Sequence, residues 1–247
     1  MSARALQNLV VFAHHGCAFI DSYFASGALT DDERACFRAV DPRAFRSDGE
    51  RQHRIIAAVI AELPVSCAIA GLDAVYGLFH DVEGFGAVVL RRLPLVVRFA
   101  ERLEGTVGDM ARIEGAIARA RRRQPRGIGY VRAAGVEVVD VGEQALRQWQ
   151  NNTSSLGDDV VGCIVGGQRL PRIGDDLLRV PLLIEPAEGA FAIAGSSPSL
   201  SALLRALEAP SDEAGAIIIA RQLGCDDDDE ARALLNDLLV DGLLARL

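Results

Sequence analysis

The feature that most constrains the fold of this chain is a change of pattern at Pro125-Arg126-Gly127. Before this tripeptide, apolar residues recur at helical spacing almost without interruption; after it, β-branched runs come first and helical patterns follow. Proline and glycine interrupt regular structure, so the change marks a boundary between two regions. The length of 247 residues is enough for two modest cores. We therefore predict an α+β fold, with an all-helical domain over 1–123 and a linker plus a smaller domain over 124–247.

The first region carries several signals of helix limits. Thr30 and Glu33 have the spacing of a capping box, which opens a helix. Asp48 precedes an amphipathic run that Pro64 ends, because proline disfavours helical geometry in the residue before it. One face of this run holds five apolar residues: Ile55, Ile56, Val59, Ile60 and Leu63. The other helices predicted in this region are Leu6–Ala25, Ala68–Phe79, Val82–Leu103 and Val107–Arg123.

The second region predicts strands first and three helices last. The strand candidates are Val136–Val141, Val160–Val165, Leu177–Ile184 and Ala190–Ala194, with a short helix at Glu143–Gln150 and a polar loop at Asn151–Gly157. The helices are Ser199–Leu207, a second opened by Ser211, Asp212 and Glu213 and stopped by Gly224, and a third led by Asp226–Asp229 that runs to Val240. This order, closed by a short turn at Asp241–Leu244, is typical of a winged helix.

The charge of the second region argues against DNA as its ligand. Residues 151–247 contain 16 acidic and 7 basic side chains, whereas residues 1–150 are almost balanced. The third helix, which would read the bases in a helix-turn-helix protein, begins with five carboxylates at Asp226–Glu230. Carboxylates there meet phosphate repulsion and release no counterions. The only cationic cluster, Arg119–Arg123, lacks the interleaved aromatic residues of a nucleic-acid surface.

The residues that carry chemistry do not form a catalytic pattern. All 26 basic residues are arginine, which excludes lysine-dependent phosphate binding and Schiff-base chemistry. The five cysteines include no CxxC pair, so neither a zinc knuckle nor a disulfide framework is expected. His14 and His15 are neighbours in a helical pattern and point in different directions, while His53 and His80 lie elsewhere. Cys67 follows Pro64 near a helix start and is the one nucleophile candidate. We predict no catalytic residue, no metal ligand and no cofactor in this chain.

Hydropathy indicates a cytoplasmic protein. The longest apolar stretches, Leu93–Val97 and Ala214–Ala220, are too short to cross a bilayer. The apolar run Leu9–Ala13 is followed at once by two histidines, which is unlike a secretion signal.

Several segments together resemble a known family. In the first region these are Arg51–Arg54 with Glu62–Ser66, Leu72–Tyr76, Phe79-His80 and Ile113–Arg122; in the second they are Glu230–Val240 and Leu238–Leu244. The first set resembles the helical domain of partner proteins to multinuclear non-heme iron oxidative enzymes, which act in the biosynthesis of ribosomally synthesised, modified peptides (RiPPs). The second set resembles the PqqD-like winged-helix elements that recognise leader peptides in such pathways.

The resemblance implies a division of labour. A separate iron-dependent oxidase would modify a ribosomally synthesised precursor peptide, and this chain would bind both the oxidase, as a hetero-oligomer, and the leader of the precursor. A leader of this kind adds as a strand to the edge of a sheet, where backbone hydrogen bonds supply affinity and side-chain pockets supply register. The expected peptide-binding residues are Ala190, Phe191, Ala192, Ile193 and Ala194 on the edge strand and Ala231, Leu234, Leu235 and Leu238 on the last helix.

Two other classes of function stay open at this point. One is a winged-helix transcription regulator with a helical effector domain, which the acidic charge of the second region disfavours. The other is an enzyme that uses Cys67 or the histidines. The leading prediction is a non-catalytic partner subunit that presents a leader peptide to an iron-dependent oxidase.

Overall fold

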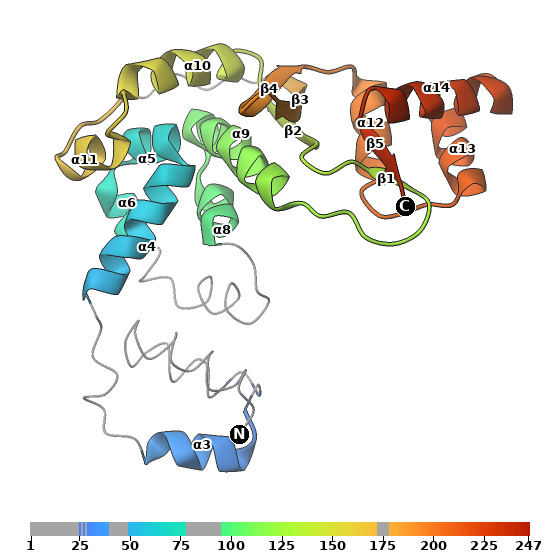
Figure 1. Ribbon diagram of the computed structural model, residues 1–247. Helices are drawn as coiled ribbons and strands as arrows, with labels where there is room; N and C mark the ends of the chain where they lie inside the picture. Colours follow the sequence, from blue (N-terminus) through green and yellow to red (C-terminus); the bar gives the residue numbers. More distant parts are fainter. Residues whose placement is uncertain (1–24, 26, 28, 40–48, 78–94, 172–177) are drawn as a thin grey trace. The chain divides into compact units, whose positions relative to one another are not determined.

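The computed structural model describes residues 25, 27, 29–39, 49–77, 95–171 and 178–247 (Figure 1). The chain divides into two compact units. The first contains residues 1–103 and 153–171, and the second contains residues 104–152 and 172–247. The first unit is helical, and the second combines strands with helices that follow them. The predicted α+β fold class, with a helical N-terminal region and C-terminal strands followed by helices, is confirmed.

Helices α3 (Asp31–Arg38), α4 (Gly49–Glu62), α5 (Pro64–Ala70), α6 (Leu72–Gly77), α8 (Leu95–Arg102) and α11 (Val160–Val165) belong to the first unit. The capping box at α3 is present: the Glu33 amide donates to Thr30 Oγ1 over 3.3 Å, and the Thr30 amide donates to Glu33 Oε2 over 3.1 Å. Pro64 separates α4 from α5, as predicted, because it occupies the first turn of α5. Ile60, Leu63 and Val65 around this break are fully buried.

No single helix of the described residues is both long and apolar enough to cross a bilayer. One pair of consecutive helices, His53–Glu62 with Pro64–Ala70, has the required length and composition together, but its axes are bent by 112° at the break.

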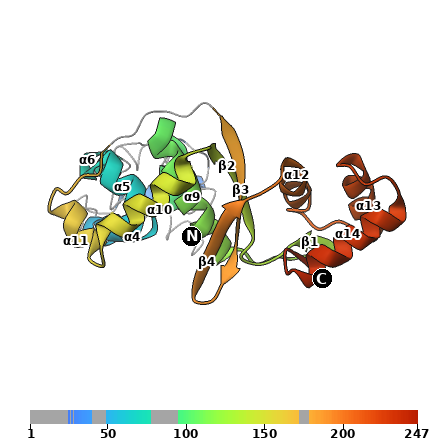
Figure 2. The same ribbon diagram turned by 90° about the horizontal axis from the view of Figure 1, so that it is seen from above.

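The second unit contains α9 (Gly105–Arg122), β1 (Tyr130–Arg132), β2 (Glu137–Gly142), β3 (Arg179–Ala187), β4 (Ala190–Gly195), α12 (Pro198–Ala206), α13 (Glu213–Gln222), α14 (Asp228–Val240) and β5 (Leu244–Arg246). α10 (Ala145–Leu156) spans the boundary between the units. Strands β2, β3 and β4 form an antiparallel sheet in that order, and β1 pairs with β5 in a separate antiparallel ribbon. In Figure 2 the three-stranded sheet lies between α9 and α12, and both helices contact β2 and β3.

Side-chain caps begin the last three helices. Ser197 accepts from the Leu200 amide at α12, Asp212 from the Gly215 amide at α13, and Asp227 from the amides of Asp229 and Glu230 at α14. The apolar faces of these helices meet β1, β2 and β5 in one core. Its most deeply buried members include Val136, Leu203, Leu204, Leu207, Ala216, Ala231 and Leu235.

Two buried charged groups tie α9 to the strands. Asp109, which is 2% exposed, accepts from the Gly142 amide over 2.9 Å and pairs with Arg112 and Arg179. The second is Glu137 of β2, which meets the C-terminal end of α9 through Arg119 and also accepts from the Arg132 guanidinium of β1, 2% exposed, over 3.1 Å. Burial lowers the pKa of Arg132, and the buried carboxylate of Glu137 opposes this effect.

Arg119 and Arg123 of the α9 end also reach Glu137, over 3.6 and 3.4 Å. The exposed carboxylate of Glu208, which follows α12, lies 3.4 Å from both Arg123 and Arg132. The basic run at the end of α9 is therefore partly engaged inside its own unit.

Several predicted elements differ from those observed. Val160–Val165 is the helix α11 and not a strand, because Asp159 caps it by accepting from the Gly162 amide over 3.0 Å. The predicted loop Asn151–Gly157 is wrong, since α10 continues to Leu156. The predicted helix from Ala68 is broken at Gly71, whose φ of 86° is incompatible with a continuous helix. The predicted helix Leu6–Ala25, apart from Ala25, and most of Val82–Leu103 lie outside the described residues.

The boundary between the compact units also differs from the predicted boundary after residue 123. Helix α9 packs on β2 and β3, and so belongs with the strands that follow it. The functional division into a partner-docking domain and a peptide-recognition domain stays a prediction.

Candidate peptide-binding surface

Strand β4 forms one edge of the three-stranded sheet. Its only partner among the described strands is β3, which it meets in a hairpin closed at Ala187 and Ala190. The Ser196 amide donates to the Pro181 carbonyl over 2.9 Å, so the backbone of Ser196 faces β3. In the register of this pair, the backbone groups of Ala190, Ala192 and Ala194 face β3 as well. Because the direction alternates along an antiparallel strand, the N–H and C=O groups of Phe191, Ile193 and Gly195 turn outward. This outward row is called the free edge below.

The two faces of β4 carry different side chains. The guanidinium carbon of Arg121, from α9, lies 5.9 Å from the centre of the Phe191 ring, so Phe191 faces the α9 side of the sheet. Ile193 shares that face, because side chains alternate along a strand. Alanines occupy the opposite face, at positions 190, 192 and 194, and leave little bulk beside the free edge. A strand added at the free edge therefore has room for its own side chains on that face.

A pocket of about 250 Å³ opens among the last three helices. The residues that line it include Ser197, Ser199 and Gly224. Its walls are apolar and are formed by Leu200, Leu203, Ala220, Leu223, Cys225 and Leu234. We call this space the helical pocket; it begins at Ser197, two positions after the last residue of β4.

Cys225, in the wall of the helical pocket, directly precedes the carboxylates at the start of α14. Burial raises the pKa of Cys225, and the charges of Glu230, Asp226 and Asp227 raise it further. None of these three carboxylates has a cationic partner among the side chains that the structure describes. The next two aspartates are different: Asp228 pairs with Arg221 over 3.1 Å, and Asp229 pairs with Arg232 over 2.9 Å. The negative charge left unpaired at the start of α14 thus lies beside Cys225.

This environment predicts slow alkylation of Cys225. With a raised pKa the thiol is less ionised at mildly alkaline pH, and the thiolate is the reactive form. Replacing the three carboxylates together (Asp226→Asn, Asp227→Asn, Glu230→Gln) should accelerate iodoacetamide labelling of Cys225 roughly threefold, because the pKa falls. Mass spectrometry of the Cys225-containing fragment measures the rate in the folded chain. Equal rates in both proteins would contradict the electrostatic cause, and in denaturing urea the rates should converge.

The predicted peptide-binding residues fall into three groups. Ala190, Phe191, Ala192, Ile193 and Ala194 form the edge strand and are all at least partly exposed. Leu234 lines the helical pocket. Ala231, Leu235 and Leu238 are 0%, 1% and 5% exposed and lie in the core of the unit. The structure thus brings Leu234 together with residues that sequence patterns did not identify, notably Leu200, Leu223 and Cys225.

Of the residues considered for catalysis, the structure describes Cys67 and His53. Cys67 is fully buried in the first unit, and His53 is exposed on α4. His14, His15 and His80 lie outside the described residues. In the part of the chain that the structure describes, no group of three or more His, Cys, Asp or Glu side chains is arranged to hold a metal ion.

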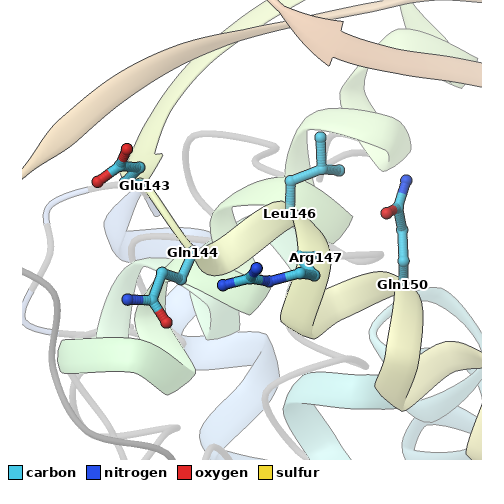
Figure 3. Close-up of a pocket in the computed structure, with 5 residues that line it drawn as sticks. All are labelled: Glu143, Gln144, Leu146, Arg147 and Gln150. Carbon is cyan, nitrogen blue, oxygen red and sulfur yellow. The ribbon is translucent and has the colours of Figure 1, made fainter.

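A second hollow, of about 440 Å³, lies along the start of α10. Figure 3 shows Glu143, Gln144, Leu146, Arg147 and Gln150 around it, with the guanidinium of Arg147 extending toward Gln144. All five residues come from one continuous segment, and they offer no nucleophile beside a base. This hollow has no catalytic arrangement comparable to an acid–base or nucleophile–base pair.

No protein-family model matches the chain, and no curated protein matches it in sequence.

Proposed function

We propose that this chain is a non-catalytic partner subunit that binds the leader of a precursor peptide and presents it to an iron-dependent peptide-modifying oxidase. The observation that carries the proposal is the free edge of β4, where Phe191, Ile193 and Gly195 turn their backbone groups outward next to the helical pocket. An extended peptide that adds to this edge gains backbone hydrogen bonds, and one of its side chains finds an apolar site.

The composition of β4 supports pairing of its free edge with a partner strand. Proteins protect exposed edge strands with charged side chains, prolines or bulges, because an apolar edge invites other strands. The segment Ala190–Gly195 contains only alanine, phenylalanine, isoleucine and glycine. A strand with no such protection is suited to regular pairing with a partner peptide.

The oxidase belongs to the proposal through the resemblance of the helical region to partner proteins of multinuclear iron enzymes. In this division of labour the iron and the oxidation chemistry reside in the second polypeptide, and the complex works in the cytoplasm. This chain contributes affinity and positioning. Its helical unit would dock the oxidase while β4 holds the leader.

The charge at α14 favours a peptide over duplex DNA. In a helix-turn-helix protein the first residues of the recognition helix approach the bases between two rows of phosphates. The first turn of α14 holds Asp228, Asp229 and Glu230, and Asp227 caps it. These carboxylates would be repelled by a duplex, whereas they can pair with cationic side chains of a peptide.

The substitution Ile193→Pro tests the proposal. Proline at this position removes an outward N–H and leaves the bonds to β3 in place, a position at which edge strands accept proline. We expect at least about a tenfold loss of affinity for peptides that the full chain selects from a displayed library of random 14-residue sequences, because an added strand loses backbone hydrogen bonds. Fluorescence anisotropy measures the affinity, and Ile193→Val, which keeps the N–H, should bind like the parent chain.

Hydrogen exchange gives an independent readout. The outward amides of Phe191, Ile193 and Gly195 should become protected when a selected peptide binds. Selected peptides that bind the Ile193→Pro variant as tightly as the parent chain would overturn the proposed edge.

Docking to the oxidase is tested separately. Co-expression with an iron-dependent oxidase encoded beside this gene should give a complex that copurifies. Stoichiometric iron in the isolated chain, lost on replacing His14, His15 or His80, would overturn the non-catalytic role.

A further inference from the structure

The helical pocket is smaller than most sites that enclose a free small molecule. Sites that enclose a free small molecule commonly measure about 300–1,000 Å³, whereas this pocket measures about 250 Å³. Its walls are mainly leucine, from Leu200, Leu203, Leu223 and Leu234, and therefore favour an apolar occupant.

Charge complementarity restricts what accompanies that apolar group. Cys225 belongs to the pocket wall and directly precedes Asp226 and Asp227, and the Glu230 carboxylate accepts from the Asp226 amide over 2.6 Å. These carboxylates have no cationic partner among the described side chains, unlike Asp228 and Asp229. An occupant that brings a cation next to its apolar group would compensate this charge.

The free edge and the helical pocket can be occupied by one extended peptide. Gly195 ends β4, and Ser197, which lines the pocket, follows two positions later. An extended chain advances by about 3.3 Å per residue, so a peptide that leaves the edge at Gly195 reaches the pocket within about two residues.

We propose that the leader peptide places one apolar side chain in the helical pocket and carries an arginine or lysine, one or two positions away, that pairs with Asp226, Asp227 and Glu230. This inference rests on the proposed peptide-binding function and specifies the chemistry of the peptide. The apolar residue anchors the register, and the basic residue distinguishes this peptide from others that share only an apolar residue.

Selection from the random 14-residue library with the full chain at low salt tests this inference. We expect the enriched peptides to contain leucine, isoleucine or phenylalanine with arginine or lysine one or two positions away. The triple substitution Asp226→Asn, Asp227→Asn, Glu230→Gln should weaken these peptides about tenfold, because several partly exposed ion pairs are lost together. Asparagine at position 227 retains a helix N-cap, so the helix should be preserved.

A matched control removes three other negative charges, two in the first turn of α14 and one at its C-cap, with Asp228→Asn, Asp229→Asn and Asp241→Asn. This control should change affinity less than about threefold, because Asp228 and Asp229 already pair with Arg221 and Arg232 and Asp241 lies at the opposite end of the helix. Replacing the basic residue of a selected peptide with glutamine should reproduce the loss seen with the triple substitution. In the triple variant the same replacement should have almost no further effect.

Two outcomes would separate the inference from the function on which it rests. The inference would be overturned if the selected peptides lacked an enriched basic residue, or if the triple substitution and its control weakened them equally. If Ile193→Pro still abolished the binding of those peptides, the peptide-binding function would stand. Peptides insensitive to Ile193→Pro would overturn both.

Discussion

Replacing Glu137 with glutamine is expected to lower the free energy of unfolding by about 3 kcal/mol, because it leaves a buried guanidinium without its main counter-charge. Arg132 is 2% exposed, and its donated bond to Glu137 spans 3.1 Å. Arg119 and Arg123 lie 3.6 and 3.4 Å from the same carboxylate, so its loss also removes the ion pairs that these two arginines form with it. Urea denaturation followed by circular dichroism measures the change.

Glu208→Gln is the matched control for Glu137→Gln. The Glu208 side chain is 65% exposed and lies 3.4 Å from both Arg123 and Arg132, so its removal should cost less than about 1 kcal/mol. Replacing both members of the buried pair, with Arg132→Met and Glu137→Leu, should recover much of the stability lost in Glu137→Gln, since no charge is then left buried. Equal destabilisation by Glu137→Gln and Glu208→Gln would show that burial does not set the strength of this pair.

The substitution Gly129→Ala is expected to destabilise the second unit by roughly 3 kcal/mol, from backbone strain and a steric clash together. Gly129 has a φ of 112°, and a Cβ atom there would lie 2.2 Å from the carbonyl oxygen of Ser211. That oxygen accepts from the Tyr130 amide over 2.7 Å, so relief of the clash would break the start of β1. Thermal unfolding and the loss of protected amides in β1 and β5 measure the effect.

Gly189→Ala provides the comparison for Gly129→Ala. Gly189 also has a positive φ, of 71°, but a Cβ atom there meets nothing within 4 Å. Its substitution should cost only about 1 kcal/mol, the strain of the left-handed conformation alone. A comparable loss of stability in both variants would indicate that the contact with Ser211 is not what requires glycine at position 129.

Local sequence was sufficient for the elements whose limits depend on their own residues. The capping box of Thr30 and Glu33, the break at Pro64 and the acidic start of α14 were predicted because caps and prolines act within one helical turn. The helix α11 was missed because Val160–Val165 is a short run of apolar residues, which periodicity cannot assign to a helix or a strand. The capping by Asp159 was the signal that could have decided it.

Features formed by residues that are distant in the sequence could not be predicted from local sequence patterns. Strands β1 and β5 are three residues each and pair with each other, and β1 also forms a single bridge from Tyr130 to Ser211. Neither strand carries a sequence pattern that indicates a strand by itself. The segment Ala190–Ala194 was predicted as a strand, but which of its backbone groups face outward depends on its register with β3. The helical pocket combines residues of three helices, and only Leu234 among its lining residues was predicted as a contact.

The ribbon of β1 and β5 has a consequence for the order in which the second unit folds. Tyr130 pairs with Arg246, and the amides of Gly129 and Leu247 donate to each other's carbonyl groups. During synthesis, β1 therefore leaves the ribosome long before its partner strand exists. The contact order of this ribbon is high, and such distant pairings form slowly. The β3–β4 hairpin, whose strands are consecutive, can form before β5 has been synthesised.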